Sequence, residues 1–429
     1  MIDAVVLLQE LVKIPSPNLP GDTRAIAAYI AEVMREAGCM VKMLAPEQKP
    51  EAQSVVATFG QGAPVIMLHA HIDTVPIAVN EAQRWSVDPY AAVIQEGKLY
   101  GKGSVDDKAP LAAMMAVILE KAHPLPLTPS PLRSEREPEN AKPLSQHGNE
   151  GEQIEGTLVL VAAAEEETGG VLGTKWLAEN GHLPMCDFIV VGEQTHNHVA
   201  TAHKGVMRAT VRATGRSVHA TNPDRGVNAI TAMAKAVLAL DAYHKELATR
   251  PHPIVGVPTC NVGVIQGGST ANAVPDSCVV YLDRRMVPGE NPAVVQDEMR
   301  AVIDGVDAGE ATLSIGEFQT SNWFESTAVS ALAQTFLGCV EGEFRKTLAP
   351  QPPLPHGEGE SENPYYPGPI GYLPGSDAKH LTGVTRGEMI IFGPGSYEVA
   401  HAFDEYVDVK EFASTVNILR AFVEHTIRD

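Results

Sequence analysis

The chain has 429 residues, more than a single hydrophobic core usually supports, so we expect two domains. Hydrophobic residues make up 44% and charged residues 20% of the sequence, which excludes disorder of the whole chain. The formal net charge of −21 argues against nucleic acid and anionic membrane surfaces as partners, because both require a basic face.

The first 18 residues are expected to begin with an amphipathic helix. Their apolar residues recur at helical spacing, and acids stand where a secretion signal needs basic residues. No apolar run in the sequence approaches the roughly 18 residues that span a bilayer. The five cysteines are odd in number and form no Cys-x-x-Cys pair, which favours reduced thiols in the cytoplasm.

Before residue 200, apolar runs suited to buried strands alternate with helical patterns. The expected strands are 65–68, 158–163 and 188–191, and the expected helices are 25–37, 111–121 and 172–180. This alternation predicts an α/β sheet covered by helices. Segments 124–156 and 348–363 are rich in Pro, Ser, Glu and Gly, so we expect disordered loop insertions there.

From about residue 206 the pattern changes to strand, helix, strand, strand, helix. The expected elements are 206–213, 229–240, 261–266, 277–283 and 293–306. This order predicts a compact α+β domain inserted into the first one. We therefore place the inserted domain at 200–308 and the main domain at 1–199 and 309–429.

The first candidate site segment continues the strand at 65–68. His69, His71 and Asp73 alternate along it, and the strand period of two places all three on one face. A histidine ligand needs an acceptor that fixes its tautomer, so His71 as a metal ligand with Asp73 as its partner is chemically sensible. By spacing alone, the His-x-His pair fits a structural role equally well.

Two further segments concentrate acids. Asp106 and Asp107 follow a Gly-Lys-Gly turn and can either bind a metal or cap the helix that begins there. Glu165, Glu166 and Glu167 end a very apolar strand, where crowded like charges call for a cation or a shared proton. Neighbouring side chains diverge, so one Glu can bind a metal while the next takes a proton from a water.

Glu193 at another strand end and His401 on a Gly-rich loop complete the set. Each of these residues alone fits a structural role. Together the segments supply two histidines and three carboxylates, which suits two zinc or cobalt ions that share one bridging aspartate.

In this order, the segments resemble the family of co-catalytic metallopeptidases that includes acetylornithine deacetylase, succinyl-diaminopimelate desuccinylase, aminoacylase and glutamate-releasing carboxypeptidases. The match runs from Leu7 to the last helix and leaves out only the two low-complexity segments. It implies an α/β catalytic domain with a mixed, mainly parallel sheet between helices, and an inserted ferredoxin-like lid and dimerisation domain. It also implies two divalent metal ions, with zinc expected and cobalt as the alternative.

The resemblance implies roles residue by residue. The implied metal ligands are His71, Asp106, Glu167, Glu193 and His401. Asp106 would bridge the two ions, and Asp73 would steer His71. Gly169 sets the register that makes Glu166 the general base rather than a ligand.

The inserted domain is similar to the family's lid, which implies a homodimer formed through it. His219 is expected to reach the active site of the partner subunit and stabilise the oxyanion. Asn272 and Arg285 resemble the pocket for the substrate carboxylate, and an arginine fork pairs well with such a group. We also assign Gly375 and Ser376 to substrate binding.

We therefore predict a cytoplasmic hydrolase that cleaves the amide bond of a small N-acyl amino acid, as acetylornithine deacetylase or the desuccinylase does. In the implied mechanism a water shared by two metals attacks the carbonyl, and Glu166 moves its proton to the leaving amine. A dipeptidase or carboxypeptidase on the same scaffold is one alternative, and a catalytically silent binding homologue is another. Ala109 and Gln194 stand where the family usually has Gly and Pro, which weakens assignment to one branch.

Overall fold

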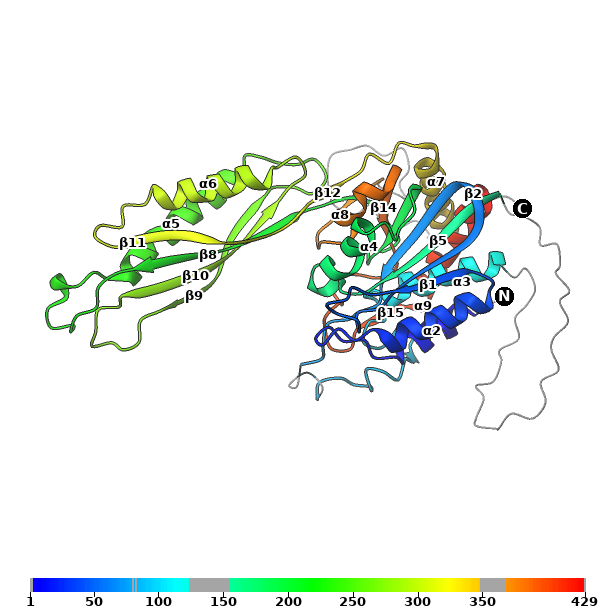
Figure 1. Ribbon diagram of the computed structural model, residues 1–429, viewed down its shortest axis with the longest axis horizontal. Helices are drawn as coiled ribbons and strands as arrows, with labels where there is room; N and C mark the ends of the chain where they lie inside the picture. The colour runs from blue at the N-terminus through cyan, green and yellow to red at the C-terminus, as the bar shows by residue number, and fades with distance from the viewer. Residues whose placement is uncertain (1–2, 79–80, 82, 123–154, 348–367, 428–429) are drawn as a thin grey trace, which may run out of the picture. The chain divides into compact units, whose positions relative to one another are not determined.

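The computed structural model describes residues 3–78, 81, 83–122, 155–347 and 368–427. The chain forms two compact units (Figure 1). The first contains residues 1–199, 328–368 and 380–429, and the second contains residues 200–327 and 369–379. The expected loop insertions lie outside the described residues, except for Glu155 and Gly156 at the start of a strand.

The sheet of the first unit contains four parallel strand segments side by side. The second half of β2 (Ser54–His71) pairs in parallel with β5 (Glu155–Ala163) and with β6 (Cys186–Gly192). β6 also pairs in parallel with β14 (Thr385–Phe392). The first half of β2 pairs antiparallel with β1 (Met40–Leu44), so the sheet is mixed. β5 and β6 are buried on both faces, as expected of strands covered by helices on both sides.

Helices and a small second sheet complete the first unit. Its helices are α1 (Ala4–Val12), α2 (Arg24–Glu36), α3 (Lys108–Ala122), α4 (Trp176–Glu179), α7 (Ala331–Thr347) and α9 (Val409–Thr426). The small sheet has the order β15 (Tyr406–Asp408), β4 (Lys98–Tyr100), β3 (Val93–Gln95). The carboxylates of Asp3 and Asp408 accept backbone N–H groups in the first turns of α1 and α9, which explains where these helices begin. α3 is buried from Lys108 to Leu119, so the turn before it rests on the core.

The second unit contains a four-stranded antiparallel sheet with the order β11-β8-β10-β9. The strands are β8 (Gly205–Thr214), β9 (Thr259–Gly267), β10 (Ser277–Met286) and β11 (Thr312–Ser321). α5 (Ala229–Leu247) and α6 (Pro292–Asp304) cover one face of this sheet and share one core with it (Figure 1). The chain order β-α-β-β-α-β with this strand order is ferredoxin-like.

The second unit also contains three short strands. β7 (Ala200–His203) pairs antiparallel with β12 (Phe324–Glu325) and in parallel with β13 (Ile370–Tyr372). The short helix α8 (Ala378–Leu381) follows β13. β11 lies beyond the 200–308 range expected for the inserted domain, and its antiparallel pairing with β8 is what joins it to this unit.

The predicted fold class is confirmed, with a mixed α/β sheet in one unit and an α+β arrangement in the other. Among the described residues, no helix combines the length and the apolar character needed to cross a bilayer.

Candidate metal centre

The predicted site residues of the first unit lie where its parallel strands end. His71 is the last residue of β2, and Glu193 directly follows β6. Glu166 and Glu167 lie in a 3₁₀ turn after β5, and His401 lies between β14 and β15. Because the carboxyl ends of parallel strands meet at one edge of a sheet, residues far apart in sequence come together there.

Asp106 lies between the two histidines. Its Oδ1 is 2.9 Å from Nε2 of His71, and its Oδ2 is 3.1 Å from Nε2 of His401. His401 Nε2 is also 3.2 Å from Oε2 of Glu167. One carboxylate thus presents a different oxygen to each histidine, an arrangement that suits a group bridging two cations.

Among the described residues, two groups of side chains bring ligand atoms close enough to share a cation. One group is His71, Asp106 and Glu167, and the other is His71, Asp107 and Glu193. Within each group the ligand atoms lie within 4.8 Å of one another. Imidazole nitrogens and carboxylate oxygens are donors that zinc and similar divalent ions accept, so this donor set fits two metal ions.

Asp73 is fully buried and joins two parts of the site. Nδ1 of His71 lies 2.9 Å from the backbone oxygen of Asp73 and 3.6 Å from its carboxylate. The Asp73 carboxylate accepts the backbone N–H of Glu166 at 3.1 Å and that of Glu167 at 3.2 Å. Asp73 therefore fixes the ring of His71 through its backbone and the turn of the two glutamates through its side chain.

Burial and crowding raise the pKa of most acids in this cluster. Burial is the main cause for Asp107, Glu167 and Glu193, and neighbouring carboxylates add to it. For Asp106 burial opposes ionisation, but hydrogen bonds from the two histidines outweigh it and hold its pKa well below the usual range. Hydrogen bonds to Asp106 and Glu167 raise the pKa of His401 to about 10. Bound cations would relieve the repulsion between these acids.

Two residues without a predicted role belong to the cluster. Asp107 is fully buried, and its Oδ2 accepts the backbone N–H of His71 at 3.1 Å, while its Oδ1 has no hydrogen-bond partner among the described residues. Gln194 Nε2 donates to Oδ1 of Asp106 at 3.0 Å and to Oε2 of Glu193 at 3.3 Å. The doubled aspartate and the departure from the family's proline were the sequence signals that pointed to them.

Glu405 connects the turn of Asp106 to the C-terminal part of the chain. Its Oε1 accepts the backbone N–H groups of Val105 at 3.1 Å and Asp106 at 3.3 Å. Its Oε2 accepts a hydrogen bond from Lys102 Nζ at 2.9 Å, and both side chains are buried. The segment that carries His401 is therefore tied to the turn that carries Asp106.

His219 and Asn272 lie in the second unit and are brought together there. Both are exposed, and the backbone N–H of Ala220 donates to the carbonyl oxygen of Asn272 at 3.0 Å. Nδ1 of His219 lies 2.9 Å from the hydroxyl of Thr221. The two side chains belong to adjacent backbone segments, although they are 53 positions apart in the sequence.

The other predicted substrate-binding residues of this unit differ in their surroundings. Arg285 is half-buried, and its Nε donates to Oδ1 of Asp283 at 2.7 Å. Gly375 is exposed, and Ser376 is fully buried, with its hydroxyl accepting the backbone N–H of Ala378 at 3.3 Å.

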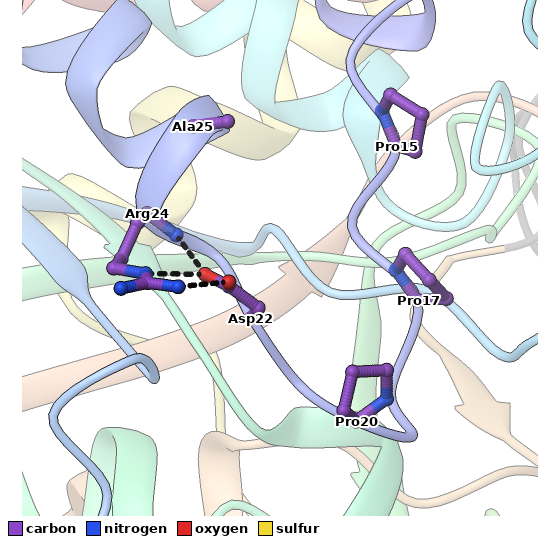
Figure 2. Close-up of a pocket in the computed structure, with 6 residues that line it drawn as sticks. All are labelled: Pro15, Pro17, Pro20, Asp22, Arg24 and Ala25. Carbon is purple, nitrogen blue, oxygen red and sulfur yellow. Dashed lines mark hydrogen bonds and ion pairs between the residues drawn. The ribbon is translucent and has the colours of Figure 1, made fainter.

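A surface hollow of about 580 Å³ lies beside the N-terminal segment (Figure 2). It is lined by Pro15, Pro17, Pro20, Asp22, Arg24 and Ala25. Arg24 Nη2 lies 2.6 Å from Oδ2 of Asp22, so the charges in the lining neutralise each other. The hollow contains none of the predicted site residues, and we assign no ligand to it.

Two family models match this chain. The model for peptidase family M20/M25/M40 matches residues 67–132, the stretch that contains His71 and Asp106. The model for the M20 peptidase dimerisation domain matches residues 201–310. The chain thus matches models for both domains of the M20 peptidases. It is a hydrolase that acts on amide bonds, as the sequence predicted.

Curated relatives resemble this chain over most of their length. Acetylornithine deacetylase of Proteus mirabilis is 27% identical over 87% of this chain and 82% of that protein. Acetylornithine deacetylase of Edwardsiella ictaluri is 26% identical over 98% of this chain and 97% of that protein.

Solved structures of M20 peptidases share the fold. A tripeptidase from Staphylococcus aureus has a TM-score of 0.69 at 21% identity and covers 98% of this chain and 97% of its own. Human carnosine dipeptidase 1 has a TM-score of 0.62 at 14% identity, with coverage of 98% and 96%. A dinuclear metal-binding M20 peptidase from Bacillus subtilis has a TM-score of 0.63 at 14% identity, with coverage of 98% and 96%.

Proposed function

We propose that this M20 peptidase removes the acyl group from a small N-acyl amino acid with the help of two divalent metal ions. The observation that carries the proposal is the carboxylate of Asp106, which contacts His71 through one oxygen and His401 through the other. Hydrolysis of a linear amide requires an activated water and stabilisation of charge on the carbonyl oxygen. A pair of divalent cations at this carboxylate is suited to both tasks.

The metal ligands are proposed to divide into two sets that share Asp106. His71 and Glu193 complete the first set, and Glu167 and His401 complete the second. When bound, the ions would supply Lewis acidity at the carbonyl oxygen and would lower the pKa of the attacking water. We propose zinc as the natural ion and cobalt as a substitute, because imidazole and carboxylate ligands bind both.

Glu166 is the proposed general base. Its backbone N–H donates a hydrogen bond to the carboxylate of Asp73. The negative charge of its own carboxylate contributes to raising the pKa of Asp107 and of Glu193. The Glu166 carboxylate therefore lies within the electrostatic reach of the cluster. It would take the proton of the attacking water and deliver it to the nitrogen of the leaving amine.

Substrate recognition is proposed to reside in the second unit. A free carboxylate on the substrate would pair with Arg285, which now bonds Asp283, so that binding exchanges one carboxylate partner for another. Asn272, Gly375 and Ser376 are the proposed remaining residues of this pocket.

We further propose a homodimer formed through the second unit, supported by the match to the dimerisation domain. In that dimer His219 would contribute a hydrogen bond to the oxyanion in the partner's active site. A cytoplasmic location is also proposed, because the five cysteines are free thiols.

Deacylation is preferred over peptide cleavage because the similarity to proteins named acetylornithine deacetylase extends over most of both chains. Dipeptide hydrolysis is the second candidate, since the solved M20 structures that share this fold include a tripeptidase and a dipeptidase. One group more or less in the acyl pocket changes specificity by only a few kcal/mol, about 1–3 per methylene, so both substrate classes have to be tested.

The test is amine release from N-acetyl, N-formyl and N-succinyl amino acids and from dipeptides. Chelated protein is compared with the same protein after zinc or cobalt is restored, and metal content is measured in parallel. We expect release only with metal, and fastest from an N-acyl amino acid. Faster release from dipeptides would replace the deacylase proposal with a dipeptidase, and no release from protein containing two ions per chain would support the binding homologue.

A further inference from the structure

Glu165 is the first of the three consecutive glutamates, and neither the proposed metal ligands nor the proposed base includes it. Its backbone has a φ of +71°, a left-handed conformation that side-chain-bearing residues adopt at a cost in energy. This residue begins the 3₁₀ turn of Glu166 and Glu167. Contacts with surrounding residues must therefore stabilise this backbone conformation of Glu165.

The carboxylate of Glu165 accepts hydrogen bonds from residues in three separate parts of the chain. Oε1 accepts a hydrogen bond from Lys49 Nζ at 2.6 Å and one from Asn18 Nδ2 at 3.1 Å. Oε2 accepts one from the hydroxyl of Thr168 at 3.1 Å. The Glu165 side chain is 6% exposed and that of Lys49 is 18% exposed, so the ion pair is shielded from solvent. Gly21 lies against it so closely that a Cβ there would be 2.5 Å from Oε1.

Asn18 connects this ion pair to the core of the site. Its side-chain amide donates to Oδ2 of Asp73 at 2.9 Å as well as to Glu165. The backbone N–H of Asn18 donates to the carbonyl oxygen of Thr74 at 2.8 Å. The carboxylate of Asp73 in turn accepts the backbone N–H of Glu166. The turn that carries the proposed base is therefore held at its start by Glu165 and at its amides by Asp73.

We propose that Lys49, Glu165 and Asn18 form a charged clamp that positions Glu166 for proton transfer. The inference rests on the proposed function of Glu166 and assigns the clamp residues as positioning residues that touch neither metal nor substrate. Misplacement of a catalytic group by about 1 Å can lower a rate about 100-fold. Loss of the clamp should therefore lower kcat more than it raises KM.

The variants for the test are E165Q, K49M, K49R and the double variant K49M/E165Q. E120Q is the matched control, because Glu120 forms a partly buried ion pair with Arg420 in the same unit at the far end of α3. Kinetics are measured at saturating zinc together with metal content. Backbone hydrogen exchange of the peptide spanning residues 164–170 is followed by mass spectrometry in the metal-free protein.

E165Q and K49M are expected to lose about 10- to 100-fold in kcat with two ions still bound and KM within about threefold. The double variant should be no worse than either single variant, because both remove the same interaction. Backbone hydrogen exchange at residues 164–170 should become faster in E165Q and in K49M. K49R should keep the kcat and the exchange rate of the wild type. E120Q should change neither.

Normal kcat and normal exchange in E165Q would overturn the clamp, and so would equal effects in E120Q or additive losses in the double variant. The exchange measurement needs no substrate. If the wild-type protein hydrolyses no amide, the proposed function fails, while unchanged or accelerated exchange in E165Q still decides whether the clamp holds the turn.

Discussion

His71, Asp73 and Glu193 of the first unit and His219 and Asn272 of the second unit lie in opposite surroundings. In the first unit His71, Asp73 and Glu193 are at most 4% exposed and belong to one connected cluster. In the second unit His219 and Asn272 are exposed. Their side chains form hydrogen bonds with Thr221 and Thr270, each two positions away in the sequence. Buried surroundings fix reactive groups in position, whereas exposed side chains remain accessible to a ligand or a second subunit.

This contrast has an energetic origin. Several carboxylates buried together repel one another and destabilise the fold unless cations bind, so such a cluster persists only where chemistry requires it. An exposed histidine or asparagine changes stability by about 0.5 kcal/mol or less when it is replaced. Variants of the first unit should therefore alter metal binding or kcat, and variants at exposed positions of the second unit should alter substrate binding or kcat while stability stays constant.

The largest effect is expected for E166Q. Loss of a general base lowers the rate of an amide hydrolase roughly 100- to 10,000-fold, and the amide side chain leaves the proposed metal ligands untouched. Steady-state kinetics and metal analysis of the same preparation measure both quantities. Activity within threefold of the wild type would remove Glu166 from the mechanism, and loss of metal would make it a ligand instead. E120Q serves again as the control.

His219 tests whether an exposed residue of the second unit acts in catalysis. H219A should lose roughly 100- to 1,000-fold in kcat, the effect of removing one oxyanion donor, with metal content and thermal unfolding unchanged. T221A, which changes the neighbour of His219, should retain most of the activity.

Mixing two inactive variants sharpens this test. If His219 acts in the partner's site, a dimer of one H219A subunit and one E166Q subunit contains one complete site, so co-refolded protein should regain part of the activity. Activity of the mixture no higher than that of the two separate variants would place His219 in its own subunit's site or outside catalysis.

Arg285 should show a smaller effect, on binding alone. A hydrogen bond to a charged group contributes about 1.5–3 kcal/mol, so R285M should raise KM roughly 10- to 100-fold and leave kcat within threefold. The comparison substrate is one whose carboxylate is replaced by an amide, for which the variant and the wild type should not differ. A fall in kcat with unchanged KM would show that Arg285 does not bind the substrate carboxylate.

Local patterns in the sequence were enough to place the segments that form the cluster and six of the strands, namely β2, β5 and β6 in the first unit and β8, β9 and β10 in the second. Apolar runs located β5 and β6, and the acids and histidines that follow strands came together because parallel strands end at one edge. β11 was missed because its apolar alternation is limited to Leu313 and Ile315 before a register shift between Gly316 and Gln319 interrupts it.

The supporting ion pairs could not be predicted in the same way. Lys49 and Glu165 are 116 positions apart, and Lys102 and Glu405 are 303 apart. No periodicity in either segment indicates its partner, because these contacts arise only where the chain crosses itself. Sequence patterns therefore identify groups that carry chemistry better than groups that hold them in place.

The smallest expected effect concerns the stability of the metal-free protein at different pH values. The pKa of His401 is raised to about 10 from 6.5, mainly by hydrogen bonds to Asp106 and Glu167, and that of Glu193 is raised by burial. The folded protein thus holds protons more tightly than the unfolded chain. The stabilisation from His401 is complete below pH 6.5 and is lost as the pH rises through about 10.

Calorimetry of chelated protein should therefore show a midpoint of unfolding that falls between pH 6.5 and pH 10. The fall should be only a few degrees, because the His401 side chain is 54% exposed and solvent screens its charge. Zinc-saturated protein should show a smaller fall over the same range, since metal binding requires deprotonated ligands and replaces protons as the source of positive charge. In H401A the fall of the unfolding midpoint with pH should be the same in the metal-free and the zinc-saturated protein. A metal-free protein that becomes more stable as the pH rises would show that the acids in the cluster are not crowded enough to need a cation, and the contrast between the two units would then have no electrostatic basis.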